Sequence, residues 1–273
     1  MNEAKSSQSI AAQLRSPDPD CRIDAMLRLA GAPQPELAED VIDALIENLS
    51  SPSKAAQRHA AGALAAAGAH NPAIAARLNA LLDAPQARLR WACAYALGRI
   101  DGALDLRALA VLLEALGDAD GDVRWAAHEL LLALGRRHRG VLRNRLLAMC
   151  NDVNPNRRKM ALYALRDLAI RDAAVIAAAG AACAGADSQV RLAALSFLKS
   201  AGRAGGQAID VVLQRLQSDP DHGVRRAAAF TLGYLDVRSE RVLSALRQAA
   251  ADGRDGGLRK AARRTLGRLQ EES

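Results

Sequence analysis

An arginine that recurs every 32 to 36 residues is the feature that most limits how this 273-residue chain can fold. Each arginine opens an apolar-periodic run, with alanine or cysteine three residues later and leucine, or once alanine, seven residues later. Offsets of three and seven lie on one face of an α-helix. A fixed period of this length is typical of stacked helical repeats. The repeat arginines are Arg22, Arg58, Arg90, Arg124, Arg158, Arg191, Arg225 and Arg259.

A second apolar run precedes each arginine, as in residues 106–116. Each repeat is therefore predicted to be a helix, a short turn and a second helix that the arginine opens. We predict an all-α, right-handed solenoid of about eight such pairs, forming one domain over residues 10–273. Residues 1–9 are polar and are predicted to be a flexible tail.

The phrase Asp-x(n)-Val-Arg-x-Ala-Ala-x(3)-Leu-Gly stands in residues 120–135 and, in similar form, in residues 219–233. It resembles the short HEAT-like repeats named after phycobilisome lyases, and the resemblance covers essentially the whole chain. It implies a solenoid whose second helices line a concave surface. Such repeats serve scaffolds, lyase subunits and a few enzymes, so the resemblance says more about fold than about function.

Aspartate stands six residues before three of the repeat arginines, at Asp118, Asp152 and Asp219. An aspartate in one turn and an arginine at the next helix start can bond within and between repeats. We interpret this pattern as a structural ladder that joins successive turns.

Composition suggests a soluble protein in a reducing compartment. The longest apolar run, residues 173–186, is too short to span a bilayer, and the first residues lack the apolar stretch of a signal peptide. The cysteines form no Cys-x-x-Cys pair, so we predict small buried thiols. We expect a cytoplasmic monomer. The cysteines are Cys21, Cys93, Cys150 and Cys183.

The residues one and five positions after each arginine point away from the alanine and leucine face. The chain has seven aromatic residues (two Trp, three Tyr and two Phe), and five of them stand at these positions. They either pack as structural filler or form a binding surface. Exposed Trp, Tyr and Arg on a rigid surface are common anchors of binding energy. We therefore predict a groove that binds an acidic or helical protein segment. Its residues are His59, Trp91, Tyr95, Trp125, Glu129, Lys159, Tyr163, Arg226 and Phe230.

Each of these residues has a predicted role in a non-enzymatic scaffold, adaptor or assembly factor. The tryptophans and tyrosines would anchor the partner. Lys159 and Arg226 would steer an acidic partner by their charge. His59, Glu129 and Phe230 would shape the ends of the contact.

Two alternatives come from other classes. The net charge is +7, and a basic run at residues 136–145, with Arg157, Arg158 and Lys159 one repeat later, could hold nucleic-acid phosphates. Resemblance to the phycobilin lyases would instead imply an enzyme subunit that holds a linear tetrapyrrole and a target protein.

His128 and Glu129 are a His-Glu pair of the kind that can bind a metal ion. HEAT-repeat deoxyhypusine hydroxylases bind two irons through several His-Glu pairs, and this chain has one such pair. One pair cannot supply a di-iron site. We predict no metal, no cofactor and no catalytic residue.

Overall fold

A computed structural model describes residues 9–32, 37–100 and 102–271, and these form helices, turns and no strand. The chain divides into two compact units, residues 1–115 and 116–273, which we describe separately. Most of the predicted tail, residues 1–8, lies outside the described residues. The helices of unit 1 are α1 (Ile10–Leu14), α2 (Pro19–Gly31), α3 (Glu39–Leu49), α4 (Lys54–Gly68), α5 (Pro72–Ala80), α6 (Ala87–Leu97) and α7 (Leu109–Ala115), with short 3-10 turns η1 (Leu81–Asp83) and η2 (Leu106–Ala108).

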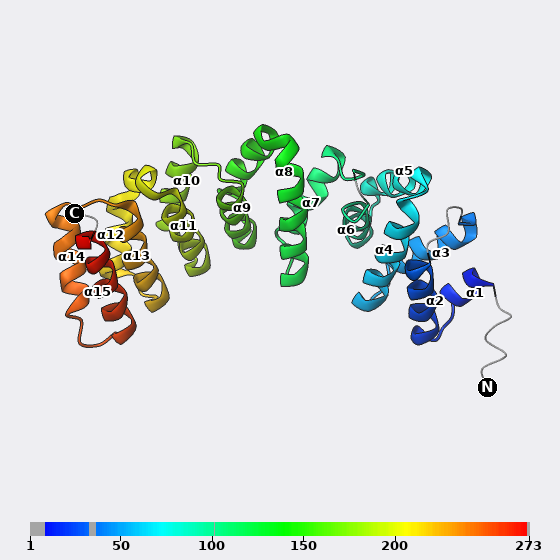
Figure 1. Ribbon diagram of the computed structural model, residues 1–273, viewed down its shortest axis with the longest axis horizontal. Coiled ribbons are helices and arrows are strands. Elements are labelled where there is room, and N and C mark those ends of the chain that lie inside the picture. Colours follow the sequence, from blue (N-terminus) through cyan, green and yellow to red (C-terminus); the bar gives the residue numbers. More distant parts are fainter. Residues whose placement is uncertain (1–8, 33–36, 101, 272–273) are drawn as a thin grey trace. The chain divides into compact units, whose positions relative to one another are not determined.

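Unit 2 holds the remaining helices and continues the same alternation of first and second helices (Figure 1). They are α8 (Gly121–Met149), α9 (Pro155–Asp167), α10 (Ala173–Cys183), α11 (Ser188–Ala201), η3 (Gly202–Ala208), α12 (Ile209–Ser218), α13 (His222–Leu235), α14 (Glu240–Ala250) and α15 (Gly256–Glu271).

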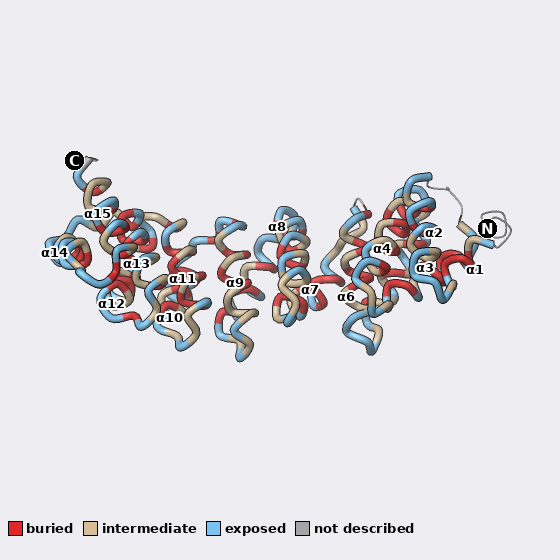
Figure 2. Tube along the Cα trace, turned by 90° about the horizontal axis from the view of Figure 1, so that it is seen from below, coloured by how far each residue is buried: buried red, intermediate tan, exposed pale blue. Residues whose placement is uncertain are grey.

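Each unit is a stack of helix pairs in two layers. In unit 1, α2 packs on α4 and α4 on α6. In unit 2, α8, α9, α11, α13 and α15 pack in succession, and α10, α12 and α14 each cover the second helix that follows. Figure 2 shows the buried stretches running along the helices within both units. The prediction of an all-α solenoid is confirmed, whereas a single domain over residues 10–273 stays a prediction.

The second helices begin where the turn supplies a cap. Asp120, Asn154, Asp187 and Asp221 each accept a hydrogen bond from a backbone N–H of the first turn of α8, α9, α11 and α13. Such a cap contributes about 1 kcal/mol to helix stability. In α9, Pro155 follows the cap and needs no N–H donor there. The polar turns of the sequence are therefore helix-start signals.

The repeat arginine fastens its helix to the preceding turn through backbone carbonyls. Arg124 Nη1 donates to the carbonyls of Asp118 and Ala119 at 2.6 and 2.9 Å, and Arg158 repeats this with Asp152 and Val153. The aspartate six residues before the arginine thus binds it through its backbone carbonyl. The carboxylate of that aspartate accepts a backbone N–H two residues further on, in the same turn. The expected bond between this aspartate and the repeat arginine is therefore present within the repeat, through the carbonyl of the aspartate and not its carboxylate.

A carboxylate ladder between repeats does exist at α11 and α13. Arg191 Nη2 donates to Asp219 Oδ1 of the next turn at 2.8 Å, and both side chains are buried. Its Nη1 still binds the carbonyls of Gly185 and Ala186. One arginine therefore joins two successive turns there.

The second repeat is shifted by one residue from the predicted register. α4 begins at Lys54, and Gln57 Nε2 donates to the Ser51 carbonyl at 2.6 Å, as the arginine does elsewhere. Gln57 thus takes the place of the repeat arginine, and the assignment of that position to the adjacent Arg58 was wrong. The position one residue after it is Arg58, which removes His59 from the predicted stripe.

The basic stretch around His138 is part of a helix and not a loop. α8 continues from Gly121 to Met149, with His138 alone in a non-helical conformation (φ −128°, ψ 38°). The first helix of the next repeat therefore continues from the second helix of this one, and a kink replaces the expected turn.

The cysteines are free, and three of the four are buried as predicted. Burial raises the pKa of Cys93, Cys150 and Cys183 to about 12, so these thiols stay protonated near neutral pH. Cys21 is partly exposed, which the prediction had wrong. No helix in the described part of the chain is long and apolar enough to cross a membrane.

Replacing either of two glycines of α4 by alanine is expected to have opposite effects on stability. A Cβ at Gly62 would meet no atom within 4 Å, whereas one at Gly68 would lie 2.6 Å from the buried Ile100 Cδ1. Gly62→Ala should stabilise the protein by about 1 kcal/mol through helix propensity. Gly68→Ala should destabilise it by about 1 kcal/mol or more, because Ile100 must move. Urea unfolding measures both, and equal shifts would contradict this packing.

Candidate functional site

Trp125 on α8 is 49% exposed, yet two neighbouring rings hold it in place. Tyr163 on α9 stacks with it at a centroid distance of 5.8 Å and an interplanar angle of 17°. The buried His128 meets it in an edge-to-face contact at 5.3 Å. Offset stacks and edge contacts of this kind are favourable aromatic geometries. Trp125 therefore presents a fixed apolar surface to solvent.

Cations flank this stack. Arg166 lies over the Tyr163 ring at 4.9 Å and also binds Asp167 and Ser196. Burial and the neighbouring Arg124 guanidinium lower the pKa of Lys159, and Asp187 partly offsets this. Burial raises the pKa of Tyr163, so its hydroxyl stays protonated.

The unit 1 candidates form a second, smaller pair. Trp91 and Tyr95 lie one turn apart on α6, with ring centroids 5.8 Å apart and an interplanar angle of 38°. Both are partly exposed, and Arg99 stands 5.9 Å from the Tyr95 centroid. The four predicted anchors thus form two pairs, and each pair lies in a different unit.

The other predicted residues lie at the exposed positions of unit 2, with one exception. Arg226 and the 38%-exposed Phe230 share one side of α13. Glu129 is exposed but faces the buried His128, with Oε1 at 3.6 Å from Nδ1. His59 is partly exposed on α4, outside the stripe for the register reason given above.

Sequence reasoning missed a third cation–aromatic cluster. Tyr234, 42% exposed, has Arg268 Cζ at 3.9 Å and Lys199 Nζ at 5.2 Å from its ring centroid. These residues stand about one helical turn after the stripe positions, which are one and five residues after each repeat arginine. Cations eight or nine residues after the repeat arginine also stand at Arg99 and Arg166, so the sequence carries this pattern too. We give the name aromatic-basic face to a set of exposed or partly exposed aromatic and basic residues of α8 to α15: Trp125, Lys159, Tyr163, Arg166, Lys199, Arg226, Phe230, Tyr234, Lys260, Arg264 and Arg268.

Much of the basic run at residues 136–159 already has structural partners. Arg139 donates to the Ala169 carbonyl, and Arg143 binds Asp172 through two hydrogen bonds. Arg157 pairs with Asp152, and Arg158 binds turn carbonyls. This leaves fewer charges for phosphate than the sequence suggested.

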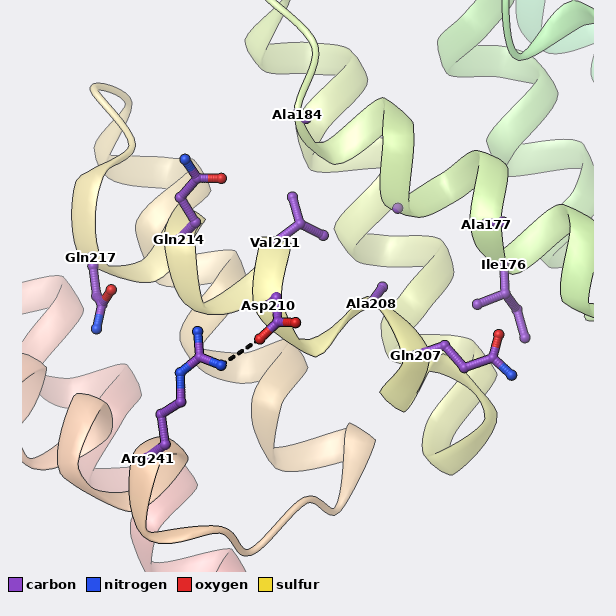
Figure 3. Close-up of a pocket in the computed structure, with 11 residues that line it drawn as sticks. Ile176, Ala177, Ala184, Gln207, Ala208, Asp210, Val211, Gln214, Gln217 and Arg241 are labelled. Carbon is purple, nitrogen blue, oxygen red and sulfur yellow. Dashed lines mark hydrogen bonds and ion pairs between the residues drawn. The ribbon is translucent and has the colours of Figure 1, made fainter.

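A hollow of about 800 Å³ lies on the first-helix side of unit 2, between α10 and α12 (Figure 3). On the α10 side the lining is mostly small: Ala177 and Gly180 of α10 and Ala184 just after it, with Ile176 as the one large side chain. Gln214 and the Asp210–Arg241 ion pair stand around it. None of the predicted site residues lines this hollow.

The described residues hold no group of three or more His, Cys, Asp or Glu side chains that could bind a metal ion.

The fold and its repeat define the class: a helical-repeat protein built on short helix pairs. A family model described as HEAT repeats matches residues 42–132 and 176–267. The chain belongs to the HEAT repeat family, while the narrower phycobilisome-lyase type stays a prediction. No curated protein sequence is similar enough to this chain to count as a relative.

Solved structures share the fold at low sequence identity. YibA of Escherichia coli is 15% identical, with a TM-score of 0.58, and the match covers 98% of this chain and 95% of YibA. Importin β is 16% identical, with a TM-score of 0.63, covering 96% of this chain and 41% of importin β. The importin Kap95p, in a structure with RanGDP, is 13% identical, with a TM-score of 0.61 and coverages of 96% and 40%. These likenesses show the fold alone.

Proposed function

We propose that this protein is a non-enzymatic scaffold that binds an acidic segment of a protein partner on the aromatic-basic face of unit 2. Trp125 is the apolar anchor, and Lys159 and Arg226 attract the partner's carboxylates. Trp91 and Tyr95 offer a second aromatic contact in unit 1. HEAT-fold proteins such as Kap95p, solved with RanGDP, make protein binding a natural use of this architecture.

One observation carries the proposal: Trp125 is half exposed and yet packed against Tyr163 and His128. An exposed tryptophan that is already fixed loses little conformational entropy on binding. More of the free energy gained by burying its surface therefore remains as affinity. Tryptophan is also among the residues most often found at the energetic centre of an interface.

The cations favour an acidic protein over single-stranded nucleic acid. Base stacking needs free ring faces. Here Tyr163 has Trp125 and Arg166 over its ring, and Tyr234 has Arg268 and Lys199. At Tyr163 and Tyr234 the cations stand where bases would stack, and their remaining N–H groups can bind carboxylates. No described feature favours a tetrapyrrole.

Labelled Asp/Glu-rich peptides that carry one aromatic or aliphatic residue test this proposal. Trp125→Ala should weaken binding by about 2 kcal/mol, or about 30-fold, in fluorescence anisotropy. Lys159→Ala should slow association and reduce the salt dependence, with a smaller effect on affinity.

Val153→Ala is the matched control, because Val153 is 94% exposed on the turn before α9 and lies outside the aromatic-basic face. It should bind as the unaltered protein does. If Trp125→Ala and Val153→Ala bind equally, the anchor is misassigned. Tighter binding of single-stranded oligonucleotides, falling steeply with salt, would replace this proposal with nucleic-acid binding.

A further inference from the structure

His128 belongs to a closed ring of side chains from α8 and α9. Its imidazole makes a T-shaped contact with Trp125, and Trp125 stacks on Tyr163. Arg166 lies over Tyr163 and binds Asp167. Asp167 Oδ2 closes the ring at 3.2 Å from His128 Nε2. A change of charge at His128 is therefore felt at the exposed anchor.

Both imidazole nitrogens face a carboxylate. Nε2 lies 3.2 Å from Asp167 Oδ2 and Nδ1 lies 3.6 Å from Glu129 Oε1, although neither contact has the geometry of a hydrogen bond. The side chain is only 2% exposed. A neutral imidazole carries one N–H and can donate to one of them at most. The imidazolium carries two and can serve both. Protonated His128 would therefore have an opposite charge on each side of its ring.

We propose that His128 is a pH-responsive positioning residue for Trp125, and that its protonation strengthens the binding of an acidic partner at this face. The second half of the proposal rests on the proposed function. Around the stack, Glu129 and Asp167 oppose the positive Lys159 and Arg166. Protonated His128 adds one positive charge, and its two N–H groups draw both carboxylates toward α8 and away from the partner.

Other charges near His128 are few. α9 contributes Asp167, Arg166, Lys159 and the protonated Tyr163 hydroxyl, and α8 contributes Glu129 and, one turn earlier, Arg124. α10 has no charged residue, and Asp172 at its start is bound by Arg143. Histidine is the side chain whose charge ordinarily changes near neutral pH. The response can therefore be assigned to His128 and to the two carboxylates that face it.

Trp91→Phe leaves Trp125 as the only tryptophan, because the chain has two. A protonated imidazole quenches the fluorescence of an indole in contact with it. Trp125 emission should fall by about half between about pH 8 and about pH 5.5 in this variant, without any partner. His128→Asn in the same background should remove the change. Asp167→Asn should move the midpoint to lower pH, because it removes an acceptor of the imidazolium.

His138→Asn, at the kink of α8, is the matched control and should keep the wild-type titration. Circular dichroism shows whether each variant is folded. If His128→Asn does not fold, Asp167→Asn still tests the proposal. Emission that is flat with pH, or that still changes in folded His128→Asn, overturns the proposal.

The binding arm separates this inference from the proposed function. Affinity for the acidic peptides should rise about threefold from about pH 8 to about pH 6, and His128→Asn should abolish that rise. A normal fluorescence titration with no peptide binding at either pH would sink the proposed function and leave the positioning role standing. Binding that is unchanged with pH, alongside a normal titration, would overturn the effect on the partner.

Discussion

Replacing Asp219 by alanine is expected to destabilise the protein by about 3–5 kcal/mol, the range for breaking a buried ion pair by removing one partner. The Asp219 side chain is fully buried, with Arg191 at 2.8 Å and Arg215 at 3.3 Å. It also accepts the Asp221 N–H in the turn before α13. The substitution would leave two guanidinium groups, Arg191 of α11 and Arg215 of α12, without their countercharge. The midpoint of urea unfolding measures the loss.

Asp210→Ala is the matched control, because Asp210 pairs with Arg241 where both side chains are largely exposed. An exposed pair contributes about 0–1 kcal/mol, so its loss should hardly change the unfolding midpoint. Similar midpoints for the two variants would mean that the Arg191–Asp219 pair contributes little beyond a surface pair.

The same aspartate sets an acid limit on stability. Burial alone would raise the pKa of Asp219, but hydrogen bonds from Arg191 and the Asp221 amide outweigh it, and the pKa is lowered on folding. A carboxyl whose pKa is lowered on folding stabilises the protein above its unfolded-state pKa. That stability is lost as the pH falls from about 4 through the native value. Asp219→Ala should therefore show a flatter decline in acid than the unaltered protein.

Phe197→Ala should cost about 3–5 kcal/mol, the usual range for emptying a buried phenylalanine site. Phe197 on α11 has no exposed surface and is the largest fully buried side chain of the described residues. The chain's other phenylalanine supplies the control: Phe230 on α13 is 38% exposed, and Phe230→Ala should cost clearly less. Thermal unfolding by circular dichroism compares the two. Equal losses would show that Phe230 is part of the core, which would also remove it from the proposed binding face.

Local sequence signals predicted the fold well, because every repeat carries its own instructions. Caps such as Asp120 and Asn154 and the regularly spaced alanines and leucines act over a single helix, so they can be read without coordinates. The signal failed where a different residue performs the same task. Gln57 binds the turn carbonyl in place of arginine, and the adjacent Arg58 hid this from a pattern based on residue type.

The candidate site was predictable in part. The stripe offsets indicated that Trp125 would be exposed, and it is. They could not indicate that Tyr163, 38 residues later, would stack on it, or that Asp167 would face His128. Those contacts depend on the rotation and distance between α8 and α9, which many side chains set together. Tyr234 was missed for a simpler reason, since it stands one turn beyond the offsets that were scored.

In this protein, local sequence specifies the helix pairs, their starts and, except at α4, the side of each second helix that faces solvent, because these depend on interactions within a few residues. The tertiary structure alone decided which exposed side chains meet: the Trp125–Tyr163 stack, the His128 ring and the buried Arg191–Asp219 pair. The physical reason is that such contacts join neighbouring helices. Their geometry follows from how closely the small residues let those helices approach, which no single repeat encodes.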